Sequence, residues 1–375
     1  MHTIIRRHSV IFACFYNKLA AMKHLPFFSF CVFVLAAMAG CSTKFNTAAP
    51  YQNITIVYGL LDEGDTAHYI RIQKAFLSQS LSAYNMEKVA DSSFYPQLNV
   101  VLEAFNSGSM VGAPITLTRV DLNQEGYQKD SGAFFTTPNY AYKFKNALDP
   151  NNTYRLLITN PASGEVDSAE TTIIDESSAN FSCPYLDNLG TTLSFSHSAN
   201  PFLVRGSVPP TVAYMEGILR VRWVEKNSQT NTTVKKYADW DFATATPSGN
   251  AGATSLGFSL TSNNFQFYDF LSGAMQVPPQ FVTRLMDSAQ LILSAANTDF
   301  YNYMQITQTL GTGLTGMDIE PNYTNMLSSK GINRVLGLYG GRAFRSGYVV
   351  YDVATLDSIM ANPVTKNLGI VGSAY

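Results

Sequence analysis

Polar and apolar residues alternate in short runs along the first half of the chain, beginning near residue 50. Seven such runs lie at residues 53–61, 68–76, 98–105, 115–120, 133–144, 154–159 and 165–174. Alternation with a period of two puts every second side chain on the same face of a β-strand. Because short strands separated by turn residues are typical of a sandwich, we predict an Ig-like antiparallel β-sandwich over residues 51–175.

The second half of the chain has a mixed pattern. Residues 176–190 show no periodicity, and we predict that they form a linker. A β-rich domain is expected from residue 191 to residue 375. Its predicted strands are residues 192–197, 212–225, 233–240, 290–294 and 347–353. The chain as a whole is therefore predicted to be mainly β.

At least one helix interrupts this second half, near residues 298–310. Asn297 or Thr298 can serve as its N-cap, and Asp299 falls in its first turn, where a negative charge suits the helix dipole. Among the predicted strands of this half, the one at residues 212–225 would place Leu219, Val221 and Trp223 on one face.

A different apolar run, at residues 25–37, ends at a cysteine. Lys23 and His24 precede it, and Met38-Ala39-Gly40 leads directly to Cys41. This order matches a secretory signal, and the run is too short for a bilayer, which needs about 20 residues. We predict a signal peptide at residues 1–40 and lipid attachment at Cys41, as in bacterial lipoproteins. The alternative is an ordinary signal peptide with a cysteine nearby.

Two further features fit this signal. Residues 41–50 are predicted to form a lipidated tether, because the chain becomes polar directly after the cysteine. Met22 begins a complete signal by itself, so it is an alternative start of the protein. Either start removes the residues before Cys41 from the mature chain.

The charge of the mature chain argues against one class of partner. Four of the 25 Lys and Arg residues, and none of the 27 acidic residues, precede Cys41. The remainder has 21 basic and 27 acidic residues, a formal charge of −6. Nucleic-acid binding needs a basic stripe and is not expected.

With Cys41 lipidated, Cys183 is the one remaining cysteine of the mature chain, so no disulfide is expected, and a buried thiol is favoured over a reactive one.

Motifs for catalysis and for metal or cofactor binding are weak. The mature chain has two histidines, His68 and His197, and no G-x-S-x-G sequence accompanies either. Residues 121–126 begin like a calcium loop, but Lys129 and Gly132 stand at its ninth and twelfth positions. Residues 311–316 match G-x-G-x-x-G but follow a helix instead of preceding one. We therefore expect no catalytic residue, no metal and no cofactor.

Aromatic residues supply the only ligand-binding candidates. They make up 13% of the chain. Tyr237 and Trp240, in the run 233–240, could form a platform on which a sugar stacks. Packing in the core is the competing interpretation of both side chains.

The C-terminal part resembles a known family. Residues 296–308 (ANTDFYNYMQITQ) precede Glu320-Pro321, then Tyr323-Thr324-Asn325-Met326 and Gly337-Leu338-Tyr339-Gly340-Gly341. This order resembles an uncharacterised family of outer-membrane lipoproteins of Bacteroidota. The resemblance implies an accessory lipoprotein, since some members are encoded near TonB-dependent transporters. It carries over no catalytic residue.

Together these patterns favour a non-enzymatic, lipid-anchored accessory or binding protein of the outer membrane, in either leaflet. It would work with a TonB-dependent transporter or present a nutrient or glycan. One alternative is a structural subunit of a fimbrillin-like pilus, although no cleavable Arg lies between Cys41 and Arg71. Another is an exported hydrolase that brings scattered carboxylates together.

Overall fold

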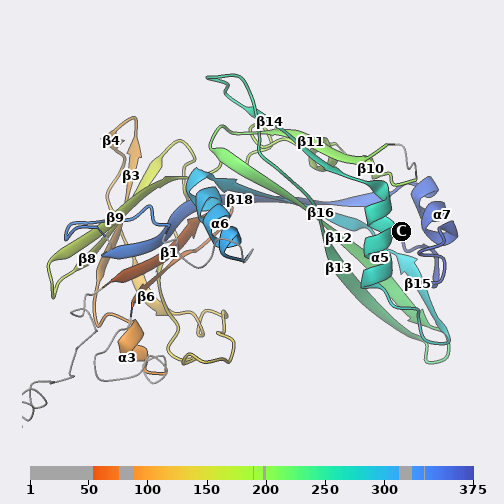
Figure 1. Cartoon of the computed structure of the whole chain (residues 1–375), viewed down its shortest axis with the longest axis horizontal. Helices are drawn as coiled ribbons and strands as arrows, with labels where there is room; N and C mark the ends of the chain where they lie inside the picture. Colours follow the sequence, from red (N-terminus) through yellow and green to blue (C-terminus); the bar gives the residue numbers. More distant parts are fainter. Residues whose placement is uncertain (1–53, 76–87, 189, 197–199, 312–322, 333) are drawn as a thin grey trace, which may run out of the picture. The chain divides into compact units, whose positions relative to one another are not determined.

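The computed structural model describes residues 54–75, 88–188, 190–196, 200–311, 323–332 and 334–375. They are mainly β, as the alternating pattern predicts (Figure 1). The signal residues 1–40, Cys41 and the tether lie outside the described residues. Among the helices that are described, none has the length and apolar character needed to cross a bilayer.

The described chain up to residue 172 contains nine strands and one short helix. The strands are β1 Thr55–Leu61, β2 His68–Lys74, β3 Asn99–Asn106, β4 Ser109–Met110, β5 Ile115–Thr116, β6 Thr118–Asp121, β7 Tyr140–Phe144, β8 Thr153–Asn160 and β9 Glu165–Thr172. The helix is α3, Ala90–Ser93. The predicted strand at residues 133–144 forms only at its end, as β7, and residues 122–139 form a loop instead.

The later part of the described chain adds ten strands, of which β12, β13 and β18 are the longest, and four helices. The strands are β10 Thr192–Leu193, β11 Phe202–Val208, β12 Val212–Asn227, β13 Thr232–Ala245, β14 Leu256–Ser262, β15 Val282–Met286, β16 Ala289–Asn297, β17 Leu327–Ser328, β18 Val335–Tyr351 and β19 Ile370–Ser373. The helices are α4 Pro184–Asp187, α5 Asn264–Ala274, α6 Thr298–Gly311 and α7 Val353–Ala361. Helix α6 is the one expected near residues 298–310.

The first half forms a β-sandwich. One layer is the end β1-β2-β7-β6 of a large 11-stranded sheet, which continues from β1 through β18 and β16 to β12. The other layer is a separate sheet with the order β17-β9-β8-β3-β4, with β5 beside β3. Val57 and Ile70 from the first sheet and Leu156 from the second are fully buried and belong to one hydrophobic cluster. Alternation in the sequence is visible here because β1, β2, β3, β7, β8 and β9 each place one face in this core.

Distant parts of the chain complete this first core. Strand β17 pairs with β9, and the first part of β18 pairs in parallel with β1. Met326 and the fully buried Tyr339 join the same cluster. Residues 52–375 form one compact unit, and the predicted boundaries at residues 175 and 190 remain predictions.

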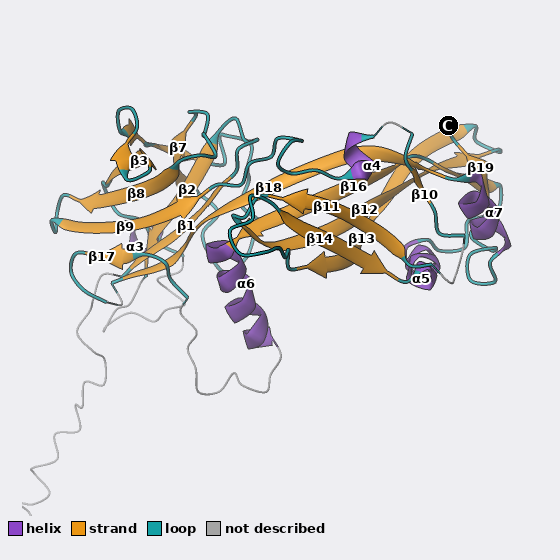
Figure 2. Ribbon diagram, turned by 90° about the horizontal axis from the view of Figure 1, so that it is seen from above, coloured by secondary structure: helices purple, strands orange, loops and turns teal. Residues whose placement is uncertain are grey.

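A second core lies around β12. This strand pairs with β13 on one side and with β16 and then β15 on the other. Leu219, Val221 and Trp223 share its buried face, as predicted, and are at most 5% exposed. They join one cluster with residues of α5, of α7 and of β11 and β14, which form a two-stranded sheet separate from the 11-stranded one (Figure 2).

Strand β18 serves both cores, because it changes neighbours along its length. Val335–Gly341 pair with β1, and the next residues, Arg342–Val349, pair with β16. At Gly337 (φ +122°) an added Cβ would lie 1.9 Å from the carbonyl oxygen of Val57. The backbones can approach this closely only because the residue has no side chain.

Asn297 links the start of α6 to the first sandwich. Its Oδ1 accepts the backbone N–H of Phe300 at 3.1 Å, so Asn297 is the N-cap. Its Nδ2 donates to Thr171 Oγ1 (2.8 Å) and to the Thr172 carbonyl (3.0 Å), both at the end of β9. One buried amide thereby satisfies a helix terminus and a strand terminus together.

We predict that Gly337→Ala destabilises the protein by about 3 kcal/mol or more, because a Cβ meets the β1 backbone at a left-handed φ. Urea unfolding would measure this change. Gly132→Ala is the matched control: its Cβ would have no neighbour within 4 Å, and the expected change is below about 1 kcal/mol. Equal stability of the two variants would contradict the close approach of β18 to β1.

Candidate functional site

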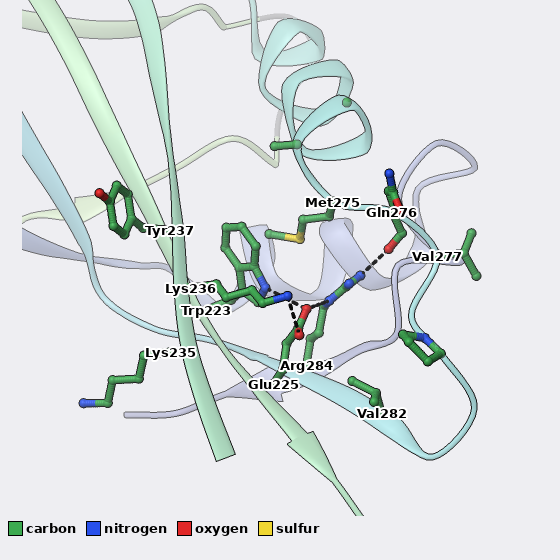
Figure 3. Close-up of a pocket in the computed structure, with 13 residues that line it drawn as sticks. Trp223, Glu225, Lys235, Lys236, Tyr237, Met275, Gln276, Val277, Val282 and Arg284 are labelled. Carbon is green, nitrogen blue, oxygen red and sulfur yellow. Dashed lines mark hydrogen bonds and ion pairs between the residues drawn. The ribbon is translucent and has the colours of Figure 1, made fainter. Parts of the chain in front are cut away.

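A hollow of about 740 Å³ opens beside the second core (Figure 3). Trp223 and Glu225 come from β12, and Arg284 comes from β15. Lys236 lies on β13, and Met275 begins the segment that follows α5. The β12–β13 hairpin therefore meets the segment that joins α5 to β15 at one surface.

An ion cluster forms the floor of this hollow. Glu225 and Arg284 are directly opposite on β12 and β15, and Arg284 Nε donates to Glu225 Oε1 at 2.9 Å. Lys236 Nζ lies 2.9 Å from Glu225 Oε2, and Trp223 Nε1 donates to Oε1 at 3.3 Å. Arg284 Nη1 also donates to the carbonyls of Gln276 (2.6 Å) and Leu368 (2.8 Å). These bonds fix the orientation of the guanidinium.

The ion cluster determines the charge state of Glu225. Burial alone would raise the pKa of this carboxyl, but hydrogen bonds from Lys236, Arg284 and Trp223 outweigh burial and hold the pKa below its usual value. Glu225 is therefore ionised at neutral pH. Such a carboxylate positions cations, and it has no proton to give as a general acid.

Strand alternation decides which β13 side chains face the ion cluster. Lys235, Lys236 and Tyr237 all line the hollow, but of these three only Lys236 points toward Glu225 and Trp223 (Figure 3). Tyr237 is 62% exposed, and the guanidinium carbon of Arg220 lies 4.5 Å from its ring centroid. The predicted candidate Tyr237 is thus accessible, but its ring is turned away from the ion cluster.

The other predicted aromatic, Trp240, is a core residue. It is 9% exposed and stacks on Phe270 with 5.9 Å between ring centroids. The structure does not bring Tyr237 and Trp240 together as one platform, because residues three apart on a strand lie on opposite faces.

Cys183 is also fully buried, and burial raises the pKa of its thiol, which opposes thiolate reactivity.

Glu225, Lys236 and Arg284 were not among the candidates predicted from the sequence. A usable signal was present for two of them. Glu225 and Arg284 occupy positions that continue the buried alternation of their strands, which is unusual for charged residues unless they are paired. Their pairing across 59 residues is a tertiary fact that spacing alone does not give.

His68 and the Asp62–Asp65 turn form a second polar cluster near β18. His68 is 1% exposed and stacks on Phe144 at 4.5 Å, and burial lowers the pKa of its imidazole. Arg342 Nε lies 3.3 Å from Asp62 Oδ2, and Arg342 Nη2 lies 3.3 Å from Asp65 Oδ2.

Within the described residues no group of three or more His, Cys, Asp or Glu side chains could hold a metal ion. His197 and residues 312–316 lie outside the described residues.

Glu176 completes this cluster. Its Oε1 accepts the backbone N–H of Phe344 on β18 at 2.9 Å, and its own N–H donates to Glu63 Oε2 at 2.7 Å. Burial and the nearby Asp62 and Glu63 raise the pKa of Glu176 to about 8. The folded protein therefore keeps this carboxyl protonated at neutral pH, where an unfolded chain would release the proton.

Comparisons with known proteins add little to this geometry. No protein-family model matches the chain, and no curated protein matches it. Among solved structures it is similar to the C-terminal globular domain of an oligosaccharyltransferase from Pyrococcus abyssi, with 7% identity and a TM-score of 0.18. That match covers 80% of this chain and 50% of the other. At this TM-score the likeness carries no argument about fold or function.

We predict that Glu176→Gln flattens the pH dependence of stability. Because the folded pKa is raised, the contribution of Glu176 is fully present below about pH 4.5 and is lost as pH rises toward about 8. Gln keeps an acceptor for Phe344 and cannot ionise. Its melting temperature should exceed that of the parent at about pH 8.5 and should vary less between about pH 5 and 8.5.

Glu170→Gln is the control for this experiment. The Glu170 side chain is 58% exposed on β9, away from this cluster, and its variant should follow the parent's pH profile. If Glu176→Gln also followed the parent's profile, the raised pKa of Glu176 would be wrong.

Proposed function

We propose that the protein is a lipid-anchored binding protein of the bacterial outer membrane, which holds a nutrient or glycan for a TonB-dependent transporter. The signal pattern before Cys41 supports the anchor, and the family resemblance supports the transporter as partner. Several acyl chains on one cysteine give a durable tether, since each buried CH₂ contributes about 0.8 kcal/mol.

The hollow above the Glu225–Arg284 pair carries the binding part of this proposal. Its volume of about 740 Å³ lies within the usual range for ligand sites. Its apolar walls include Met275, Val277 and Val282. Its ion cluster is held in place by the bonds of Glu225 to Arg284 and Lys236. A saccharide, with apolar ring faces and many hydroxyl acceptors, suits such a surface.

The two alternatives gain less support. A glycosidase needs two carboxylates about 5 to 9 Å apart. Glu225 is the only acid among the described residues that line the hollow, and it is ionised and held by three donors. For a pilus subunit, donor-strand assembly would add a strand to an open sheet edge, and β1 offers no such edge because it is paired on both sides, with β18 and β2.

The partner is tested by purification from the outer membrane. A tag after Tyr375 would recover the full chain in mild detergent. A TonB-dependent transporter in equal amount supports the proposal. Ladders of the protein alone would favour the pilus, and recovery of the protein without any partner would contradict the transporter part.

The anchor is tested by Cys41→Ala. We expect this variant to move from the detergent phase to the aqueous phase in Triton X-114 partition, because it cannot be acylated. Cys183→Ala is the matched control: this buried cysteine takes no lipid, so the variant should stay in the detergent phase with the parent. Retention of Cys41→Ala in the detergent phase would contradict the lipid anchor.

The hollow is tested by two lysines, one inside it and one outside it. Lys236→Ala removes a cation that faces Glu225, and Lys226→Ala removes an exposed cation of β12 that does not line the hollow. For glycans that the parent retains on a glycan array, titration calorimetry should show about tenfold weaker binding for Lys236→Ala. Lys226→Ala should bind within about twofold of the parent. Equal affinities of the two variants would place the glycan elsewhere.

A further inference from the structure

A second hollow, of about 300 Å³, lies on the outer face of β1 and β2 in the first sandwich. Ile56 and Tyr58 alternate with the fully buried Val57, so they face away from the sandwich core. Arg71 is directly opposite Tyr58 on β2. The loop between β6 and β7 contributes Lys129, and it also contributes Phe134 and Phe135.

This hollow concentrates positive charge on a protein whose mature chain is negative. Three cations line it, namely Arg71, Lys74 and Lys129, and none of the described lining residues is acidic. Across the described residues, none of the three forms an ion pair with a carboxylate. Burial lowers the pKa of Arg71, and burial and the charge of Arg71 lower the pKa of Lys129. Arg71 and Lys129 are thus close to each other, and no carboxylate of the described residues is paired with either of them.

Neutral partners hold Arg71 and Lys129 in place. Arg71 Nη2 donates to Asn139 Oδ1 at 2.5 Å, and Asn139 is 3% exposed. Lys129 Nζ donates to the Phe135 carbonyl at 2.9 Å and lies 4.7 Å from the Phe135 ring centroid. An amide and a carbonyl fix position without cancelling charge. The positions of both cations are therefore set before a ligand binds, and both positive charges can still interact with an anion.

The loop that begins like a calcium site serves this hollow instead. Asp121 Oδ1 accepts the backbone N–H groups of Asn123 (3.1 Å) and Asn139 (3.0 Å), so its carboxylate is used to hold the loop. Asn123 Oδ1 accepts the N–H of Lys129 at 3.2 Å. Lys129 stands at the ninth position of the calcium pattern, where it would repel a cation, and its side chain lines the hollow.

We propose that this hollow binds a small organic anion, in which a carboxylate, sulfate or phosphate group is joined to a sugar-sized body. The oxyanion would lie between Arg71 and Lys129, where a guanidinium can donate two parallel hydrogen bonds. The body would lie against Tyr58 and Phe134. A volume of about 300 Å³ is at the lower end for ligand sites and suits a single ring. This site shares no residue with the first hollow and stands whether or not that hollow binds a glycan.

Titration calorimetry on the full-length lipoprotein in detergent tests this assignment. The probes are D-galacturonate, glycerol 3-phosphate, inorganic phosphate and neutral D-galactose. D-galacturonate or glycerol 3-phosphate should bind at least about tenfold more tightly than D-galactose and than inorganic phosphate. The first would indicate an acidic sugar and the second a phosphate headgroup as the source.

Arg71→Gln and Lys129→Gln should each weaken that binding about tenfold or more, since each removes a charged donor. Lys235→Gln, on β13 and outside this hollow, is the matched control and should bind like the parent. Lys129→Gln provides an independent test if Arg71→Gln fails to fold, which its melting curve would reveal.

Three results would overturn the proposal. The first is no heat of binding for any anion at millimolar concentration. The second is affinity that both substitutions leave unchanged. The third is inorganic phosphate binding as tightly as the organic anions, which would show that the aromatic walls contribute nothing.

Discussion

The approach of β18 to β1 at Gly337 is the constraint on which the rest of the structure depends. Seven residues of β18 pair in parallel with seven of β1, far earlier in the sequence. The same strand then continues along β16 and places Ala343 and Val349 in the second core. A side chain at Gly337 would separate β18 from β1. That separation would withdraw Tyr339 from the first core and disturb the strand on which the second core is built.

Local pattern predicted the fold class because the longer strands of the two cores each have one buried face. The face of Leu219, Val221 and Trp223 was predicted correctly, and so was the helix that Asn297 caps. Helix α5 was missed, although a capping box at its start, Asn263 to Gln266, could have been recognised. The parallel pairing of β1 with β18 could not be predicted, because register between distant strands depends on tertiary packing.

The sites were harder to predict than the fold for a related reason. Alternation predicts that neighbours on β13 face opposite ways, but it does not say which face meets β15 and the segment after α5. Tyr237 lines the hollow, but its neighbour Lys236 is the residue that faces the ion cluster (Figure 3). In the same way, the sequence of residues 121–132 resembles an incomplete calcium loop, and it does not indicate that Asn139 binds Arg71 beside that loop. In both cases the role of a residue depends on a neighbouring strand that local pattern does not identify.

The two hollows use charge in opposite ways. In the first, Arg284 is 5% exposed and is balanced by Glu225, and breaking such a buried pair typically costs roughly 3 to 5 kcal/mol. In the second, neutral oxygens hold Arg71 and Lys129, and no described carboxylate balances their charge. From Cys41 onward the chain has 21 basic and 27 acidic residues, and it does not attract anions from a distance. Charges more than about 8 Å apart are also largely screened at physiological ionic strength. Attraction of an anion must therefore come from cations within direct reach of the ligand, and the second hollow places two of them together.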